Sequence, residues 1–337
     1  GWIADLVSAN LCRPGDLLNP ASELRGHSVY QALLSAATNT QGADGCPTEN
    51  LGAGFCGLGA EWNETEKKWT KLFYDTAPVT DRRADLIARR LAERGYNSNY
   101  VASWFLVRGG VRLSRGGSSY KFTNSPSGGA RGQFGSMGPL TRRALDNARV
   151  GSNVVALLGN AASADPSKAA LSLSIEKSPA TYYAGGGSSD QSAVQYLDTR
   201  APLTDSYCVG PAVYNPGTAR IELLPADTDL TTQVRCERGE QSCGTADTSL
   251  GASHGWLQDS RGFAAVHSGS CNILMADGGV RMFADTNRDG YLNPGFPIRG
   301  THSEEELNRV GYRSSIVELP EAQFFSGVFL EKVRAGF

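Results

Sequence analysis

The sequence predicts an α+β fold that combines an antiparallel β-sheet with short helices and long glycine-rich loops. Apolar stripes of helical period and runs of β-forming residues both occur, without the alternating βαβ rhythm of a parallel sheet. Two apolar runs flank Asp277-Gly278, which is the strongest short-range signal for a β-hairpin. Glycine accounts for 40 of 337 residues, about 12% against a usual level of roughly 7%, which predicts many turns and surface loops.

Apolar residues at helical spacing predict the first helices. One covers residues 2–10 and a second covers residues 27–38. A third is the best defined, because Thr80 or Asp81 can cap its first turn and Gly95 can end it.

The middle of the chain predicts mixed elements. Residues 99–113 are rich in β formers around Gly109-Gly110, which predicts a pair of strands. A short helix is expected in 139–148, and a buried strand is expected in 152–159. Residues 160–250 carry only short elements, so we expect an elaborated loop insertion within one globular head that spans residues 1–337.

The last part of the chain is the most informative. Residues 272–276 and 280–283 form the expected hairpin around the Asp277-Gly278 turn. Ser303 precedes Glu306 by three residues, which is the capping box of a helix N-terminus. The segments SSIVELP and FFSGVFLEKV, which close the chain, both read as strands.

The charge balance excludes several partner classes. Lys and Arg number 32 against 34 Asp and Glu, for a formal net charge of −2. Nucleic-acid and anionic-lipid partners need a basic surface, so neither is expected. No apolar run reaches the ~18 residues that a membrane-spanning helix needs.

Seven cysteines favour an oxidising, extracytoplasmic compartment. None forms a C-x-x-C pair, so zinc-ribbon and thioredoxin-type motifs are excluded. Cys46 and Cys56 bracket one short loop, and Cys236 and Cys243 bracket another, so these are the expected disulfides. The alternative is that all seven are reduced thiols of a cytosolic protein.

A D-x-N-x-D-G turn predicts a calcium site. Asp285, Asn287 and Asp289 occupy alternate positions, and the next residue is a glycine that permits the sharp bend. The carbonyl of Tyr291 and the side chain of Asn293 can add further oxygen ligands. The alternative is an Asx-rich turn whose side chains bond only their own backbone.

The final position of this loop departs from the usual calcium motif. Phe296 stands where a bidentate glutamate is expected, so a carboxylate must come from elsewhere. Glu304, Glu305 and Glu306 are the candidates that follow closely in the sequence.

His267 precedes Asp277-Gly278 by nine intervening residues. We expect these residues to form a structural motif, with His267 at the start of a strand and hydrogen-bonded near the Asp277 turn. The alternative is a metal-dependent hydrolase that uses His254, His267 and Asp277. No nucleophile elbow, P-loop or H-E-x-x-H motif occurs, so no catalytic residue is assigned.

The string from His267 to Asp277-Gly278, with CNILMADGGVRMF, resembles the C-terminal His-x₉-Asp-Gly signature of planctomycete-type pilin-like (pseudopilin-like) surface proteins. GWIADL, SNYVASW, NARVGSNVVALLG and DTNRDGYLNPGF also look like family landmarks in the expected order.

This resemblance implies a non-catalytic structural subunit of a type IV pilus-like or type II secretion pseudopilus-like assembly. The chain then corresponds to a pilin-like head at the cell surface, in the periplasm or outside the cell, without the N-terminal helix that holds such subunits in the membrane. Its expected partners are other pilin-like subunits, and calcium is its expected structural ion, as in secretion pseudopilins. The main alternative is a surface binding module for a glycan or protein, with Trp62 and Trp69 as a stacking platform on one helical face.

Overall fold

The structure is a computed structural model of the chain. It describes residues 2–3, 6, 10–12, 16–24, 26–35, 60–63, 68–71, 76–116, 118–123, 135–162, 170–178, 193–240 and 255–330.

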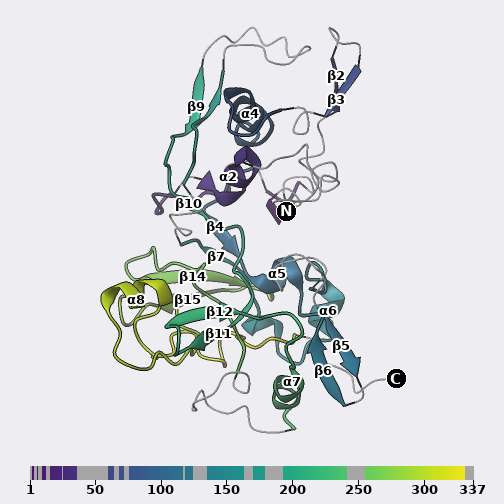
Figure 1. Cartoon of the computed structure of the whole chain (residues 1–337), viewed down its shortest axis with the longest axis vertical. Coiled ribbons are helices and arrows are strands. Elements are labelled where there is room, and N and C mark those ends of the chain that lie inside the picture. Colours follow the sequence, from purple (N-terminus) through teal and green to yellow (C-terminus); the bar gives the residue numbers. More distant parts are fainter. Residues whose placement is uncertain are drawn as a thin grey trace. The chain divides into compact units, whose positions relative to one another are not determined.

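The chain divides into two compact units, which are described separately (Figure 1). Unit 1 comprises residues 1–100 and 163–206, and unit 2 comprises residues 101–162 and 207–337. The expected insertion, residues 160–250, contributes to both units. That residues 1–337 form one head stays a prediction.

In the described part of unit 1, the helices α2 and α4 accompany short two-stranded sheets. Strands β2 and β3 form an antiparallel hairpin, β8 and β9 form another, and β1 pairs with β10 in parallel. The elements are β1 (Gly26–His27), α2 (Ser28–Ser35), β2 (Ala60–Asn63), β3 (Lys68–Lys71), α4 (Asp81–Ile87), the π-helical turn η2 (Ala88–Ala92), β8 (Ile175–Lys177), β9 (Val194–Leu197) and β10 (Leu203–Thr204).

The core of unit 1 forms where the apolar faces of α2 and α4 meet β8, β9 and β10. Helix α4 begins as predicted, because the Thr80 side chain accepts a hydrogen bond from the backbone N–H of Arg83. The buried apolar residues of this core are Tyr30, Leu33, Leu34, Ala84, Leu86, Ile87, Ala88, Leu91, Leu171, Ile175, Leu197 and Leu203.

Unit 2 contains the larger sheets and the remaining helices. Its elements are α5 (Trp104–Arg108), β5 (Leu113–Gly116), β6 (Ser119–Phe122), α6 (Arg142–Asp146), η4 (Ser152–Val154), β7 (Ala156–Asn160), β11 (Pro211–Asn215), β12 (Arg220–Leu223), α7 (Thr231–Glu237), β13 (Leu257–Gln258), β14 (Ser270–Met275), β15 (Val280–Ala284) and α8 (Glu304–Val310). One sheet has the order β12-β11-β13, and β5 and β6 form a separate hairpin.

The predicted C-terminal hairpin is confirmed, and it forms half of the main sheet. The strand order is β15-β14-β7-β4, where β4 is Tyr100–Ala102. Strand β14 runs antiparallel to both of its neighbours. Its residues Cys271, Ile273 and Met275 have no exposed surface and form the centre of the core. The α+β class with antiparallel sheets is therefore confirmed.

The strand pair predicted in 99–113 is wrong over residues 104–108, the end of its first strand. After β4 the chain forms helix α5, because the Ser103 side chain caps the backbone N–H of Leu106 and Gly109 closes the helix at φ 65°. Trp104 and Phe105 are buried, so tertiary packing overrides the β preference of these residues.

The two strands predicted at the C-terminus are also wrong within the residues described, which end at 330. The backbone N–H groups of Val328 and Phe329 donate to the buried carboxylate of Glu237, at 2.7 and 3.0 Å. Arg149 forms an ion pair with the same carboxylate at 3.1 Å. This segment is therefore held by a side chain of α7 instead of a neighbouring strand.

We expect Ser103→Ala to destabilise unit 2 more than Thr141→Ala does. Both residues cap five-residue helices, α5 and α6, and loss of a cap costs about 1 kcal/mol. The Ser103 hydroxyl also donates to the buried Ala156 carbonyl at 2.6 Å, and losing this bond adds about 1 kcal/mol or more. Urea unfolding of the two variants measures the difference in the free energy of unfolding. Equal losses would contradict a stabilising role for the bond from Ser103 to Ala156 of β7.

Candidate metal centre

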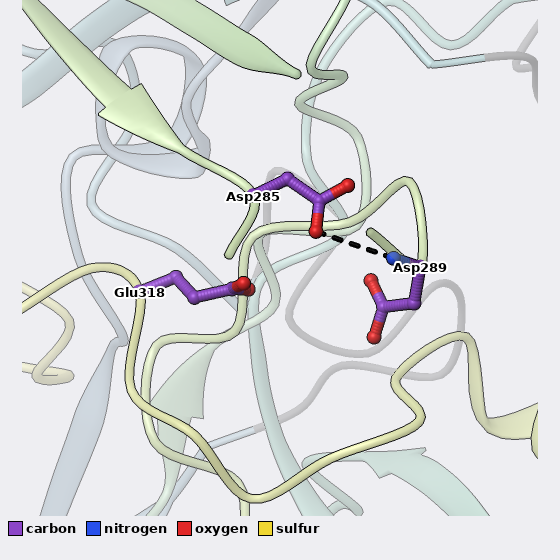
Figure 2. Close-up of side chains that lie close together, drawn as sticks. All are labelled: Asp285, Asp289 and Glu318. Atoms are coloured by element: carbon purple, nitrogen blue, oxygen red, sulfur yellow. Dashed lines mark hydrogen bonds between the residues drawn. The ribbon is translucent and has the colours of Figure 1, made fainter. Parts of the chain in front are cut away.

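Three carboxylates converge where β15 ends. Asp285, Asp289 and Glu318 each place one oxygen within 4.8 Å of the others (Figure 2). Two come from the predicted D-x-N-x-D-G turn, and Glu318 comes from the C-terminal segment. Asp285 and Glu318 are buried, at 9% and 6% exposure.

The turn curls around the Asp285 carboxylate as the motif predicts. Its Oδ1 accepts the backbone N–H of Asp289 at 3.2 Å, and its Oδ2 accepts the N–H of Gly290 at 2.8 Å. Gly290 has a φ of 91°, which a side chain would strain. Local backbone bonds therefore set the position of the first carboxylate.

The second half of the turn is held in the same way. The Asn287 side chain accepts from the Asp289 N–H at 2.9 Å and donates to Asp289 Oδ2 at 2.9 Å. Asp289 Oδ1 accepts the N–H of Tyr291, and Oδ2 also accepts the N–H of Arg313 at 2.8 Å. These hydrogen bonds are the ones expected of an Asx-rich turn, the alternative to a calcium loop. Bonds between the side chains and the backbone of the turn therefore hold its shape.

Glu318 ties the turn to the C-terminal segment. One carboxylate oxygen accepts the backbone N–H groups of Thr286 and Asn287, at 2.6 and 3.2 Å, and the Thr286 hydroxyl at 3.0 Å. The other oxygen accepts the N–H of Asn293 at 3.0 Å. Residues 286–293 therefore fold around a single buried side chain.

The third carboxylate is not one of the three expected from the sequence. Glu306 closes the predicted capping box, where the backbone N–H and hydroxyl of Ser303 donate to its carboxylate and lower its pKa. Glu304 forms an ion pair with Arg313 at 2.6 Å. No short-range motif identifies Glu318 as a member of the site. The one signal in the sequence is that Glu318 is a single acidic residue within the apolar run IVELP.

The Asn293 side chain forms its hydrogen bonds outside the acidic cluster. Its carbonyl oxygen accepts the N–H groups of Gly295 and Phe296, both at 2.8 Å. Its amide donates to the carbonyls of Phe296 and Ser314, at 3.1 and 2.7 Å. This amide therefore closes a local turn, and its part in a calcium site, like that of the Tyr291 carbonyl, stays a prediction.

The charges of the cluster favour a cation. No ion pair between these three carboxylates and a Lys or Arg side chain is found among the described residues. Each carboxylate has about four lone-pair sites, so acceptor capacity stays free on Asp285 and Asp289, which accept two and three of the hydrogen bonds above, whereas Glu318 already accepts four. Hard oxygen ligands of this kind match Ca²⁺ chemistry.

His267 and Asp277 lie at opposite ends of β14. The His267 N–H and carbonyl bond Ser270 across the turn that enters the strand, at 2.9 and 3.1 Å. Asp277 accepts the N–H of Gly279 at 2.8 Å in the hairpin turn. The six residues of β14 lie between them, about 20 Å at ~3.3 Å per residue, so the predicted hydrogen bond between His267 and this turn is wrong.

The predicted disulfides are only partly covered by the structure. Cys236 lies in α7, whereas Cys46, Cys56 and Cys243 lie outside the described residues. Among the cysteines described, Cys12, Cys208 and Cys271 form no disulfide. Both pairings therefore stay predictions.

The comparisons with known proteins give one family. Residues 141–290 match the model of a family described as a protein of unknown function (DUF1559). No curated protein and no solved structure matches the chain. In the part of the chain that the structure describes, no helix is long and apolar enough to cross a membrane. The matched residues cover less than half of the chain and include all of β7, β14 and β15. This family is the planctomycete-type pilin-like family that the sequence resembles.

Proposed function

We propose that this chain is the head of a non-catalytic structural subunit of a type IV pilus-like or type II secretion pseudopilus-like surface assembly. The observation that carries the proposal is the family match over residues 141–290. The sheet β15-β14-β7-β4, in which β14 runs antiparallel to β15 and β7 and most of which lies in the matched region, agrees with a pilin-like head. Its proposed partners are other pilin-like subunits, and its proposed location is the cell surface or the space outside the inner membrane.

We also propose that Asp285, Asp289 and Glu318 hold a structural Ca²⁺. Three carboxylates within reach of one another repel when all are ionised, and a divalent cation would remove most of this repulsion. The ion would then link the end of β15 to the C-terminal segment. Asn287 and the Tyr291 carbonyl are the other proposed oxygen ligands within the turn.

Calcium is expected to raise the melting temperature, and Glu318→Gln is expected to abolish that rise. A ligand at 100 times its Kd adds about 2.7 kcal/mol to the free energy of unfolding, and each kcal/mol corresponds to about 2–4 °C for a domain of 150–250 residues. Differential scanning calorimetry in excess calcium and then in chelator measures the shift.

The matched control for this experiment is Glu305→Gln. Glu305 is an exposed acid in the first turn of α8 that the sequence, but not the structure, places in the site. This control should keep the full calcium-dependent shift. A shift that disappears in Glu305→Gln but persists in Glu318→Gln would place the ion with Glu305 and contradict the proposed site. A wild-type protein indifferent to calcium would leave only the Asx-rich turn.

The alternative function, a surface binding module, is the one that uses Trp62 and Trp69. Trp62 lies directly opposite Trp69 in the antiparallel register of β2 and β3, so the predicted helical spacing is wrong but the two residues remain neighbours. This backbone register keeps a surface module that binds a glycan or protein as the second candidate function. The hydrolase alternative also needs His254, which lies outside the described residues, and its other two residues, His267 and Asp277, are separated by the length of β14.

Surface display tests the main proposal. The full gene product with an epitope tag should appear in the filament fraction sheared from intact cells, and deletion of the prepilin peptidase should remove it from that fraction. A binding module that is secreted by another route would reach the surface without the peptidase. Retention of the tagged protein in the cytoplasm would contradict both functions.

A further inference from the structure

Strand β15 forms an open edge of the main sheet. It pairs with β14 on one side, and within the described residues no strand pairs with its other side. The β14–β15 register runs without a shift from Ser270↔Ala284 to Leu274↔Val280. The edge therefore lacks a bulge, and the sequence VRMFA contains neither Lys nor Pro, the usual guards of an exposed edge.

The hydrogen bonds at the two ends of the β14–β15 pair identify which backbone N–H and C=O groups of β15 face away from β14. The N–H of Asp285 donates to Gly269, and the carbonyl of Gly279 accepts from Met275. Inward bonding alternates along an antiparallel strand, so the odd-numbered residues of β15 bond to β14. The N–H and C=O groups of Val280, Met282 and Ala284 consequently point away from the sheet.

The same three residues present an apolar surface. Val280 and Met282 are 66% and 70% exposed, and Ala284 is also exposed. Val280 lies beside Leu274, which lies beside Leu158 on β7, so the apolar row continues across three strands. Large apolar side chains exposed next to free backbone groups are typical of a strand-pairing surface.

We propose that β15 binds β15 of a second copy of this chain, antiparallel and about a two-fold axis at Met282. In that register Met282 faces its counterpart, and Val280 faces Ala284 of the second copy. Each of these pairs exchanges both of its backbone bonds, so every outward N–H and C=O of the three residues is used. The contact is isologous and therefore closes as a dimer.

The chemistry of β15 favours a copy of itself as the occupant. The outward-bonding residues on both sides of Met282, Val280 and Ala284, are apolar. A two-fold axis at Met282 therefore places apolar side chains of one copy against apolar side chains of the other. Its single charge, Arg281, then lies opposite Phe283 of the second copy instead of opposite another Arg281. A register centred on Arg281 would bring the two guanidinium groups together, which like charges disfavour.

The test uses the purified chain, so it does not depend on the proposed surface function. A contact of one short strand is small, and such interfaces are transient. The weight-average mass in sedimentation equilibrium should therefore rise toward that of a dimer between about 10 µM and 1 mM. Hydrogen exchange should show Val280, Met282 and Ala284 amides protected only at high concentration, with Arg281 and Phe283 amides protected throughout.

Two variants address the strand edge, and one serves as a matched control. Met282→Lys places a charge on the apolar strip, and Met282→Pro removes an outward N–H without touching the bonds to β14. Met137→Lys makes the same charge change at a methionine that is 59% exposed and whose backbone N–H bonds the carbonyl of Gly110, just after α5. Both Met282 variants should remain monomeric at 1 mM, whereas Met137→Lys should dimerise like the wild type.

Two results would overturn the proposed dimer. A wild-type chain that stays monomeric at 1 mM overturns the inference, as does a folded Met282→Pro or Met282→Lys variant that still dimerises. Circular dichroism reports whether each variant is folded. If the proline variant unfolds, the lysine variant decides, because its side chain lies in solvent.

Discussion

The register of β14 against β15 fixes the geometry of the main sheet and of both its ends. At one end the bond between Asp285 and Gly269 places the first carboxylate of the acidic cluster. At the other end the bonds between Met275, Gly278 and Gly279 close the hairpin turn. A slip of one residue would expose the buried face of β14 and displace the cluster, so core packing and site geometry are specified together.

Aromatic packing brings the C-terminal segment to this sheet. Phe324 meets Phe283 of β15 and Phe263 edge to face, with ring centroids 5.9 and 6.2 Å apart. Upstream, the carbonyl of Asn293 accepts the backbone N–H groups of Glu318 and Leu319, at 2.9 and 3.1 Å. Burial of apolar rings therefore supplies the free energy that holds a buried carboxylate beside two others, which an isolated turn could not achieve.

Local signals account for what the sequence predicts, and tertiary contacts account for what it misses. The Asp277-Gly278 turn and the Ser303 capping box each depend on a few adjacent residues, so both are confirmed. Helix α5 is missed because its residues favour strands, whereas its burial and the caps at Ser103 and Gly109 depend on the fold. Glu318 is missed as a member of the acidic cluster because only packing of the C-terminal segment brings it near Asp285.

The position of Glu318 in the chain has a consequence for the order of folding. The turn around Asp285 forms from neighbouring residues, but Glu318 follows it by 33 positions (318 minus 285) and arrives only when the C-terminal segment has docked. Contacts of long sequence separation form late, after the loop between them has been closed. A chain exported in an unfolded state would complete this cluster only on the far side of the membrane, where the ion content of the surroundings, not that of the cytoplasm, determines what occupies it.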